Sequence, residues 1–96
     1  LAAVATNNFT YHLFSCIQDY CNKHQLPYST LKPLLIRTIE NINKEYPFKL
    51  QTGPAKRKDI KIIETHLNLL QDEEFLLDIY RLLSNQILKK HQDHEL

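Results

Sequence analysis

Four side chains near the start of the chain are of the kinds that bind zinc: His12, Cys16, Cys21 and His24. His12 and Cys16 stand four residues apart, so on a helix they share one face. Cys16 and Cys21 stand five apart, a turn of about 140°, and therefore point in different directions. No Cys-x-x-Cys pair occurs. The spacing argues against a metal site and favours two reduced thiols.

The segment from Thr52 to Asp59 carries groups that could hold an anionic substrate. Arg57 offers a planar fork that fits a carboxylate or phosphate, and Asp59 could orient Arg57 while the loop closes over the substrate. The alternative is structural. Thr52 or Asp59 caps the following helix, and Arg57 pairs with Asp59 at the surface in a contact worth about 0 to 1 kcal/mol. Both interpretations remain open.

His66 falls on the apolar side of an expected helix and is the candidate for acid–base catalysis. An imidazole suits this role because its pKa lies near neutrality. The alternative is a packed histidine satisfied by one hydrogen bond, and geometry must decide between the two. No Ser-His-Asp or Cys-His arrangement can be read from the order of residues.

Apolar residues at helical spacing predict four helices that position these groups. The first spans residues 1 to about 24, and the second runs from a cap at Ser29 or Thr30 to about Lys44. An irregular stretch then leads to a third helix, which begins between residues 54 and 59, and Asp72 caps the fourth. Four helices with wide apolar stripes pack as an antiparallel bundle. We therefore expect an all-α fold.

Composition limits the function further. Ninety-six residues suit one domain, and the single glycine argues against phosphate-cradling loops. Twelve Lys/Arg against eleven Asp/Glu give a net charge of +1, too little to attract nucleic acid or an anionic membrane. No apolar run approaches the roughly 20 residues that span a bilayer. We expect a cytoplasmic protein without nucleic-acid or membrane partners.

Three segments together resemble one family: residues 3–9, residues 31–34, and residues 51–59 followed by His66-Leu67. They are similar to the C-terminal helical domain, a domain of unknown function, of predicted NADP oxidoreductases related to pyrroline-5-carboxylate reductase and the hydroxyacid dehydrogenases. The resemblance covers nearly all of residues 1–96 and implies a C-terminal domain of the 6-phosphogluconate-dehydrogenase-like kind. The family often has Gly before the aspartate, where this chain has Lys58.

This resemblance implies an N-terminal Rossmann domain, absent from this chain, that binds most of the NADP or NAD. The helical domain would dimerise and wall the cleft for a small-molecule substrate. In the resembling dehydrogenases an asparagine on the first helix borders that cleft, so Asn8 is expected to hydrogen-bond the substrate. The alternatives for Asn8 are ordinary exposure and a bond between helices. Asn is mildly unfavourable within a helix, so its presence there can indicate a role other than helix formation.

The expected function is thus the dimerisation and substrate-cleft domain of an NAD(P)-dependent oxidoreductase of unknown substrate. By itself it would be inactive, because it lacks the nucleotide-binding half. Leu1 stands within a helical pattern without an initiator Met, which predicts a fragment. The alternative function is a free-standing helical interaction module without catalysis. A helix-turn-helix DNA binder is disfavoured by the balanced charge.

Overall fold

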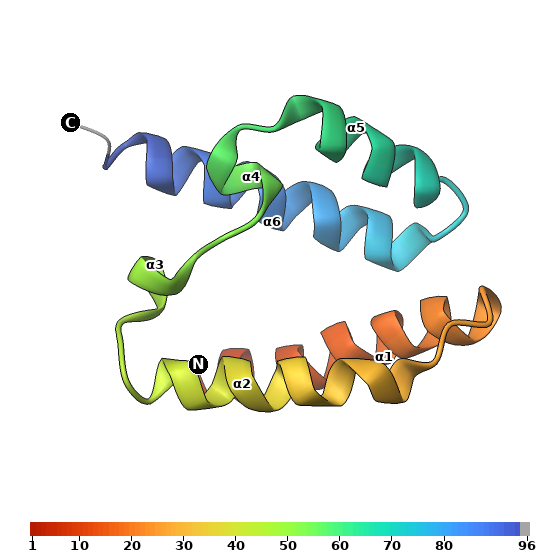
Figure 1. The fold of residues 1–96 in the computed structure, drawn as a ribbon, viewed down its shortest axis with the longest axis horizontal. Coiled ribbons are helices and arrows are strands. Elements are labelled where there is room, and N and C mark those ends of the chain that lie inside the picture. Colours follow the sequence, from red (N-terminus) through yellow and green to blue (C-terminus); the bar gives the residue numbers. More distant parts are fainter. Residues whose placement is uncertain (95–96) are drawn as a thin grey trace. The chain divides into compact units, whose positions relative to one another are not determined.

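The computed structural model describes residues 1–94. These residues form helices that are joined by short turns (Figure 1). The predicted all-α class with four main helices is confirmed. The main helices are α1 (Phe9–Lys23), α2 (Lys32–Ile42), α5 (Ile60–Leu69) and α6 (Glu74–Gln92). The shorter elements are the π-helical turn η1 (Val4–Asn8), the 3₁₀ turn η2 (Tyr28–Leu31), α3 (Pro47–Leu50) and α4 (Pro54–Arg57).

The chain divides into two units, residues 1–40 and 41–96. In the first unit, η1 and α1 form one continuous helix, and α2 returns in the opposite direction after η2 (Figure 1). Cys16 and Cys21 are the buried residues of α1, and both are free thiols. Free cysteine behaves as a small apolar side chain and is among the residue types most often buried.

The end of α1 is a Schellman motif, in which a left-handed residue lets two amides satisfy the last carbonyls. The amide of Leu26 donates to the Cys21 carbonyl at 2.8 Å, and the amide of Gln25 donates to the Asn22 carbonyl at 3.3 Å. Gln25 takes the left-handed position, with φ 57°. This turn directs the chain from α1 into η2.

Glycine in place of Gln25 should stabilise the protein by about 0.5 to 1 kcal/mol, because an L side chain is strained at this positive φ. Urea unfolding of the two proteins would measure the difference. The matched control is Gln18→Gly, on an exposed position within α1, which should instead cost about 1 kcal/mol. A loss of stability in the Gln25 variant would contradict the expectation.

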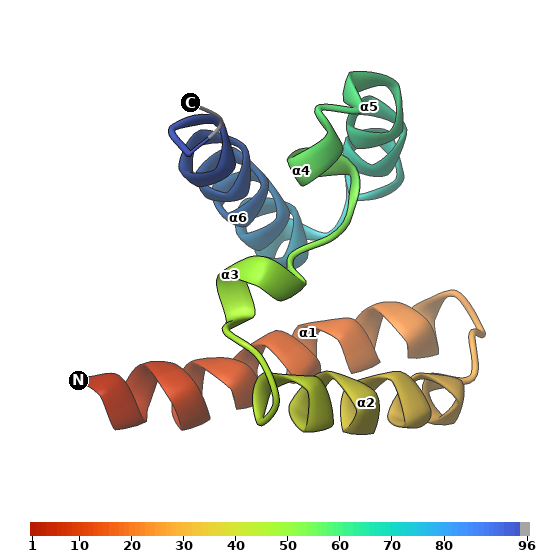
Figure 2. The ribbon, with the colours of Figure 1, turned by 60° about the vertical axis from the view of Figure 1, so that its left-hand side comes forward.

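The second unit is built around α4, α5 and α6. α4 contacts both α5 and α6, and α5 and α6 form an antiparallel hairpin (Figure 2). Ala55 of α4 and Leu70 at the end of α5 are the buried apolar residues of this unit. A residue as small as Ala55 allows the short helix to approach its two neighbours closely.

Three details differ from the sequence-based expectation. The stretch expected to be irregular holds α3 and α4, because Pro47 and Pro54 stand at first helical positions, where proline favours helix initiation. The second helix ends at Ile42, earlier than predicted. The cap of α6 is Glu73 and not Asp72, and the Glu73 side chain makes no capping bond. Helix ends are uncertain by one or two residues, so a sequence pattern does not decide which of two adjacent residues caps a helix.

Candidate functional site

Asn8 is the candidate in the first unit, and it ends the π-helical turn η1. There the amide of Phe9 donates to the Val4 carbonyl, five residues back. Such turns are rare within α-helices and are frequent at functional sites. The side chain of Asn8 is exposed, so both the substrate-binding role and ordinary exposure fit it. Asn7 and Asn8 are unfavourable within a helix, but the sequence did not predict this irregularity.

The remaining candidates lie in the second unit, beginning at the turn before α4. Gly53 adopts φ 103° and ψ 173° as the residue before α4, a conformation nearly restricted to glycine. Thr52 is exposed, and its carbonyl accepts a hydrogen bond from Gln51 Nε2 at 3.2 Å. No side chain caps α4, so Thr52 is not its cap. Ala55, the second residue of α4, is buried, and α4 contacts both α5 and α6. These contacts hold the segment in place.

Asp59 makes both contacts that the structural interpretation predicted. Its Oδ1 accepts the amide of Ile62 at 3.3 Å and so caps α5. Its Oδ2 lies 4.0 Å from Arg57 Nη2, and the Arg57 side chain is 60% exposed. At that exposure the ion pair stabilises the fold by at most about 1 kcal/mol. The guanidinium therefore stays accessible to an anion while Asp59 limits its orientation.

Lys58 separates these two residues and adopts the left-handed conformation, with φ 59° and ψ 36°. This is a conformation that glycine takes without steric cost. The lysine therefore does not prevent the turn that places Arg57 beside Asp59, although it costs some backbone strain.

His66 projects from α5 towards α6 and meets Tyr80. Its Nδ1 lies 2.8 Å from the Tyr80 hydroxyl, and the two rings are nearly perpendicular, with centroids 5.6 Å apart. Burial raises the pKa of Tyr80 above its ordinary 10.0, and a hydrogen bond with Ser84 lowers it in part. The His66 Nδ1 and the Tyr80 hydroxyl are within hydrogen-bond distance, so this contact occupies Nδ1.

Removing the hydroxyl in Tyr80→Phe should lower the free energy of unfolding by about 0.5 to 1.5 kcal/mol, because His66 loses its hydrogen bond. Chemical unfolding near neutral pH would measure this loss. Tyr11→Phe is the matched control, because Tyr11 is 71% exposed and should change stability by less than about 0.5 kcal/mol. Equal effects in the two variants would contradict the role given to Tyr80.

The raised pKa of Tyr80 also predicts a dependence of stability on pH. The unfolded chain ionises this phenol from about pH 10.0, whereas the folded chain holds the proton to higher pH. The unfolded state therefore binds fewer protons above pH 10.0, and stability should fall as the pH rises. Below that pH Tyr80 contributes no slope. Unfolding curves between about pH 9 and 11 should show a steeper fall for the wild type than for Tyr80→Phe.

The possible metal-binding group in α1 forms in part. Cys16 Sγ lies 3.7 Å from His12 Nε2, as expected for side chains on one helix face. Within residues 1–94, no group of three or more His, Cys, Asp or Glu side chains is placed to hold a metal ion. Likewise, none of the helices described is long and apolar enough to cross a membrane.

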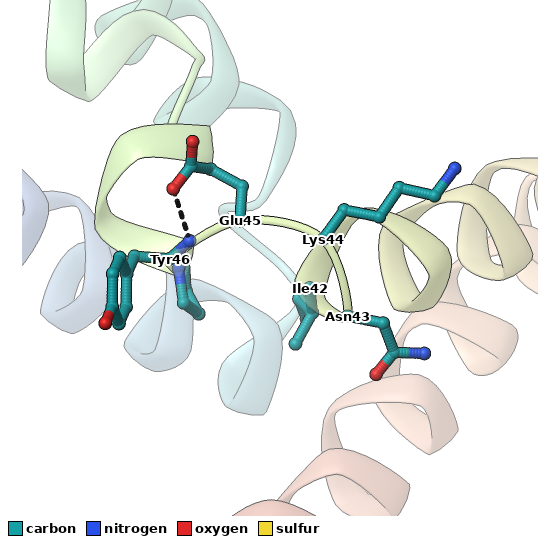
Figure 3. A pocket seen from close by; sticks show the side chains of 6 residues that line it. Ile42, Asn43, Lys44, Glu45 and Tyr46 are labelled. Atoms are coloured by element: carbon teal, nitrogen blue, oxygen red, sulfur yellow. Dashed lines mark hydrogen bonds between the residues drawn. The ribbon is translucent and has the colours of Figure 1, made fainter.

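A hollow of about 290 Å³ lies at the bend between α2 and α3 (Figure 3). It is lined by the consecutive residues from Ile42 to Pro47, and the Glu45 carboxylate accepts the amide of Tyr46 at 2.9 Å. Because one short segment lines it, this hollow follows from the local path of the chain. Its lining is the end of α2, the start of α3 and the connection between them, and it includes none of the candidates above.

Comparison with known proteins shows the family of the chain and a similar solved structure. Residues 1–87 match the family DUF2520, described as a domain of unknown function. The chain belongs to this family. No curated protein matches it. Among solved structures it is similar to a "putative NADP oxidoreductase" from Bacteroides fragilis, with a TM-score of 0.87 and 37% identity over 93% of this chain.

The match covers 35% of the Bacteroides fragilis chain, so this DUF2520 chain spans about a third of that relative's length. The resemblance drawn from the three sequence segments is confirmed by the family match and by this neighbour. The identity and the TM-score together support a shared helical domain and not a fold likeness alone.

Proposed function

We propose that this DUF2520 chain is the C-terminal, substrate-side domain of an NAD(P)-dependent oxidoreductase. The observation that carries the proposal is the similarity, at 37% identity, to a chain described as a "putative NADP oxidoreductase", of which the matched part is 35%. A further domain that holds the dinucleotide is expected in the remaining length of such a protein.

The cofactor would be NADP or NAD, held mainly by that further domain. Dinucleotide-binding turns use several glycines, so that the backbone approaches the pyrophosphate closely. This chain has one glycine, Gly53, which initiates α4. Its residues therefore do not fit the pyrophosphate, and we assign them to the substrate side.

The accessible Arg57 would bind a carboxylate or phosphate of the substrate, with Asp59 orienting it and Thr52 at the edge of the same turn. His66 would supply the acid or base, because the Tyr80 contact fixes Nδ1 and leaves Nε2 to exchange a proton. Asn8 would hydrogen-bond the substrate from the π-helical turn. These roles are supported by the exposure of Arg57, the His66–Tyr80 contact and the local irregularity at Asn8.

A homodimer is part of the proposal, with the start of the first helix in its interface. Val4, Phe9 and Tyr11 are 44%, 63% and 71% exposed, and a monomer rarely leaves such a group of apolar side chains uncovered. A second copy or the protein's own Rossmann domain would cover them. Light scattering, repeated with Phe9→Ser, would separate these partners, because only a dimer contact would make the molar mass fall in the variant.

The decisive experiment is titration of the intact protein with NADPH, followed by the fluorescence of the nicotinamide. Saturable binding in the micromolar to millimolar range that is usual for enzyme ligands would support the proposal. A protein that binds neither NADPH nor NADH would refute its redox part. His66→Gln and Arg57→Gln should leave this binding unchanged, because both residues are assigned to the substrate.

A second candidate function is a helical interaction module without catalysis, favoured by the same exposed apolar residues at the start of the first helix. It differs in one respect that can be measured. Dimer formation without nucleotide binding by the intact protein would support the module and exclude the oxidoreductase.

A further inference from the structure

Phe48 of α3 is surrounded by basic side chains from the end of α6. The His91 ring stacks on it with centroids 4.2 Å apart and an interplanar angle of 2°, and the His94 ring meets it edge-on at 5.0 Å. Lys90 Nζ lies 5.8 Å from the centre of the Phe48 ring. An aromatic ring attracts a cation through its face and stacks with other rings, so Phe48 can hold Lys90 and the two imidazoles close together.

Beside this stack lies a hollow of about 230 Å³, which we term the basic hollow. It is lined by Phe48, Lys49, Lys56, His91 and His94. These residues come from α3, from α4, from the end of α6 and from the turn after it, so the fold and not a run of sequence assembles them. Among residues 1–94, the side chains that line this hollow are one aromatic ring, two lysines and two histidines.

Lysine and histidine side chains that converge from separate elements can offer positive charge and several N–H donors to one anion. The volume of the basic hollow is below the range of about 300 to 1,000 Å³ typical of sites that enclose a whole ligand. It suits a single small anionic group. Lysine binds phosphate as a point charge, and a phosphate offers several acceptor oxygens to converging donors.

We propose that the basic hollow binds a phosphate group. Lys49 and Lys56 contact the phosphate oxygens from two sides, and the imidazoles of His91 and His94 donate hydrogen bonds to it. This site lies outside the proposed redox chemistry, because it shares no residue with the Arg57, Asp59 and His66 group.

An adjoining hollow of about 210 Å³ indicates that the phosphate belongs to an organic molecule. It shares Phe48 and His91 with the basic hollow, and its other lining residues are Pro47, Gln51, Leu83, Gln86, Ile87 and Lys90. Apolar side chains and two amides suit a small organic group with a few polar atoms. A phosphate monoester would thus place its phosphate on the lysines and its organic part against Phe48.

The test is a titration of the intact protein with inorganic phosphate at fixed pH and ionic strength, followed by the NMR signals of the histidine rings. Fixed ionic strength matters because weak contacts between exposed charges are screened by salt. The signals of His91 and His94 should shift and saturate, whereas those of His12, His24 and His66 should not move. His91→Gln and His94→Gln assign the two signals.

The variant Lys49→Gln/Lys56→Gln should raise the Kd for phosphate at least about 10-fold, because it removes two charge-assisted contacts. Both side chains are exposed, so the substitutions should not prevent folding. The matched control is Lys32→Gln/Lys61→Gln, which removes two exposed lysines away from the basic hollow and should leave the Kd unchanged. Equal loss in both double variants, or shifts that never saturate, would overturn the proposal.

Two further anions separate the possible ligands. Glycerol phosphate should bind more tightly than inorganic phosphate if the adjoining hollow takes the organic part, whereas equal affinities would assign the site to free phosphate. Acetate should bind at least about 10-fold more weakly than either phosphate, because it brings one charge and two oxygens. Acetate binding equal to that of both phosphates would show a general cationic surface and overturn the proposal.

Discussion

Replacing Leu70 by alanine should lower the free energy of unfolding by about 2 to 4 kcal/mol. Leu70 is 6% exposed and is the C-cap of α5. Its amide donates to the His66 carbonyl at 3.1 Å, and its carbonyl accepts the amide of Glu73 at 2.9 Å. The backbone is thus held on both sides and has little freedom to close the cavity that alanine would leave. Urea unfolding followed by circular dichroism would measure the loss.

Leu69→Ala is the matched control, because it makes the same substitution at the preceding residue. Leu69 is 58% exposed, so its truncation should cost less than about 1 kcal/mol. A similar loss in both variants would contradict the central place given to Leu70. The difference matters, because a domain of this size has a total stability of only about 5 to 15 kcal/mol.

The same side chain connects stability to the candidate site. Leu70 ends the helix that carries His66, and the turn after it leads into α6, which carries Tyr80. Loosening this turn should weaken the His66–Tyr80 hydrogen bond together with the packing. The Leu70→Ala variant should therefore also move the NMR signals of His66, and Leu69→Ala should not.

The four main helices were predictable from the sequence because their cause is local: apolar residues at helical spacing mark α1, α2, α5 and α6. The short helices α3 and α4 were not predicted, although prolines at first helical positions are compatible with them. The π-helical turn before Phe9 was not predicted, since it depends on which carbonyl accepts the Phe9 amide and several choices fit the same residues. The left-handed conformations of Gln25 and Lys58 were not predicted either, because neither Gln nor Lys favours that conformation.

In the candidate site, too, some contacts were predictable from the sequence and others were not. Arg57 and Asp59 are two residues apart, so their pairing and the cap on α5 could be proposed from spacing alone. Tyr80 lies 14 residues from His66 on another helix, so the contact between them could not be proposed from spacing. Phe48 reaches His91 across an even longer separation, and no sequence period connects them. Contacts between elements depend on packing angles that a pattern within one element does not contain.

Substituting Gly53 by alanine should destabilise the protein by about 1 to 3 kcal/mol. The cause is the backbone alone. Apart from Gly53 and its two chain neighbours, no heavy atom lies within 4 Å of the position that the new Cβ would occupy, so a clash with more distant residues is excluded as the reason. At φ 103° and ψ 173° an L side chain is strained by its own backbone. Thermal and urea unfolding would both report the loss.

The matched control is Lys56→Ala, which places the same methyl group on an exposed helical residue of α4 and should change stability by less than about 0.5 kcal/mol. A second readout tests the site. Because Gly53 begins α4 and α4 carries Arg57, relieving the strain by a shift of the turn should alter the Arg57 guanidinium NMR signal. An unchanged stability in Gly53→Ala would show that the turn adopts another conformation, and the placement of Arg57 beside Asp59 would then have to be revised.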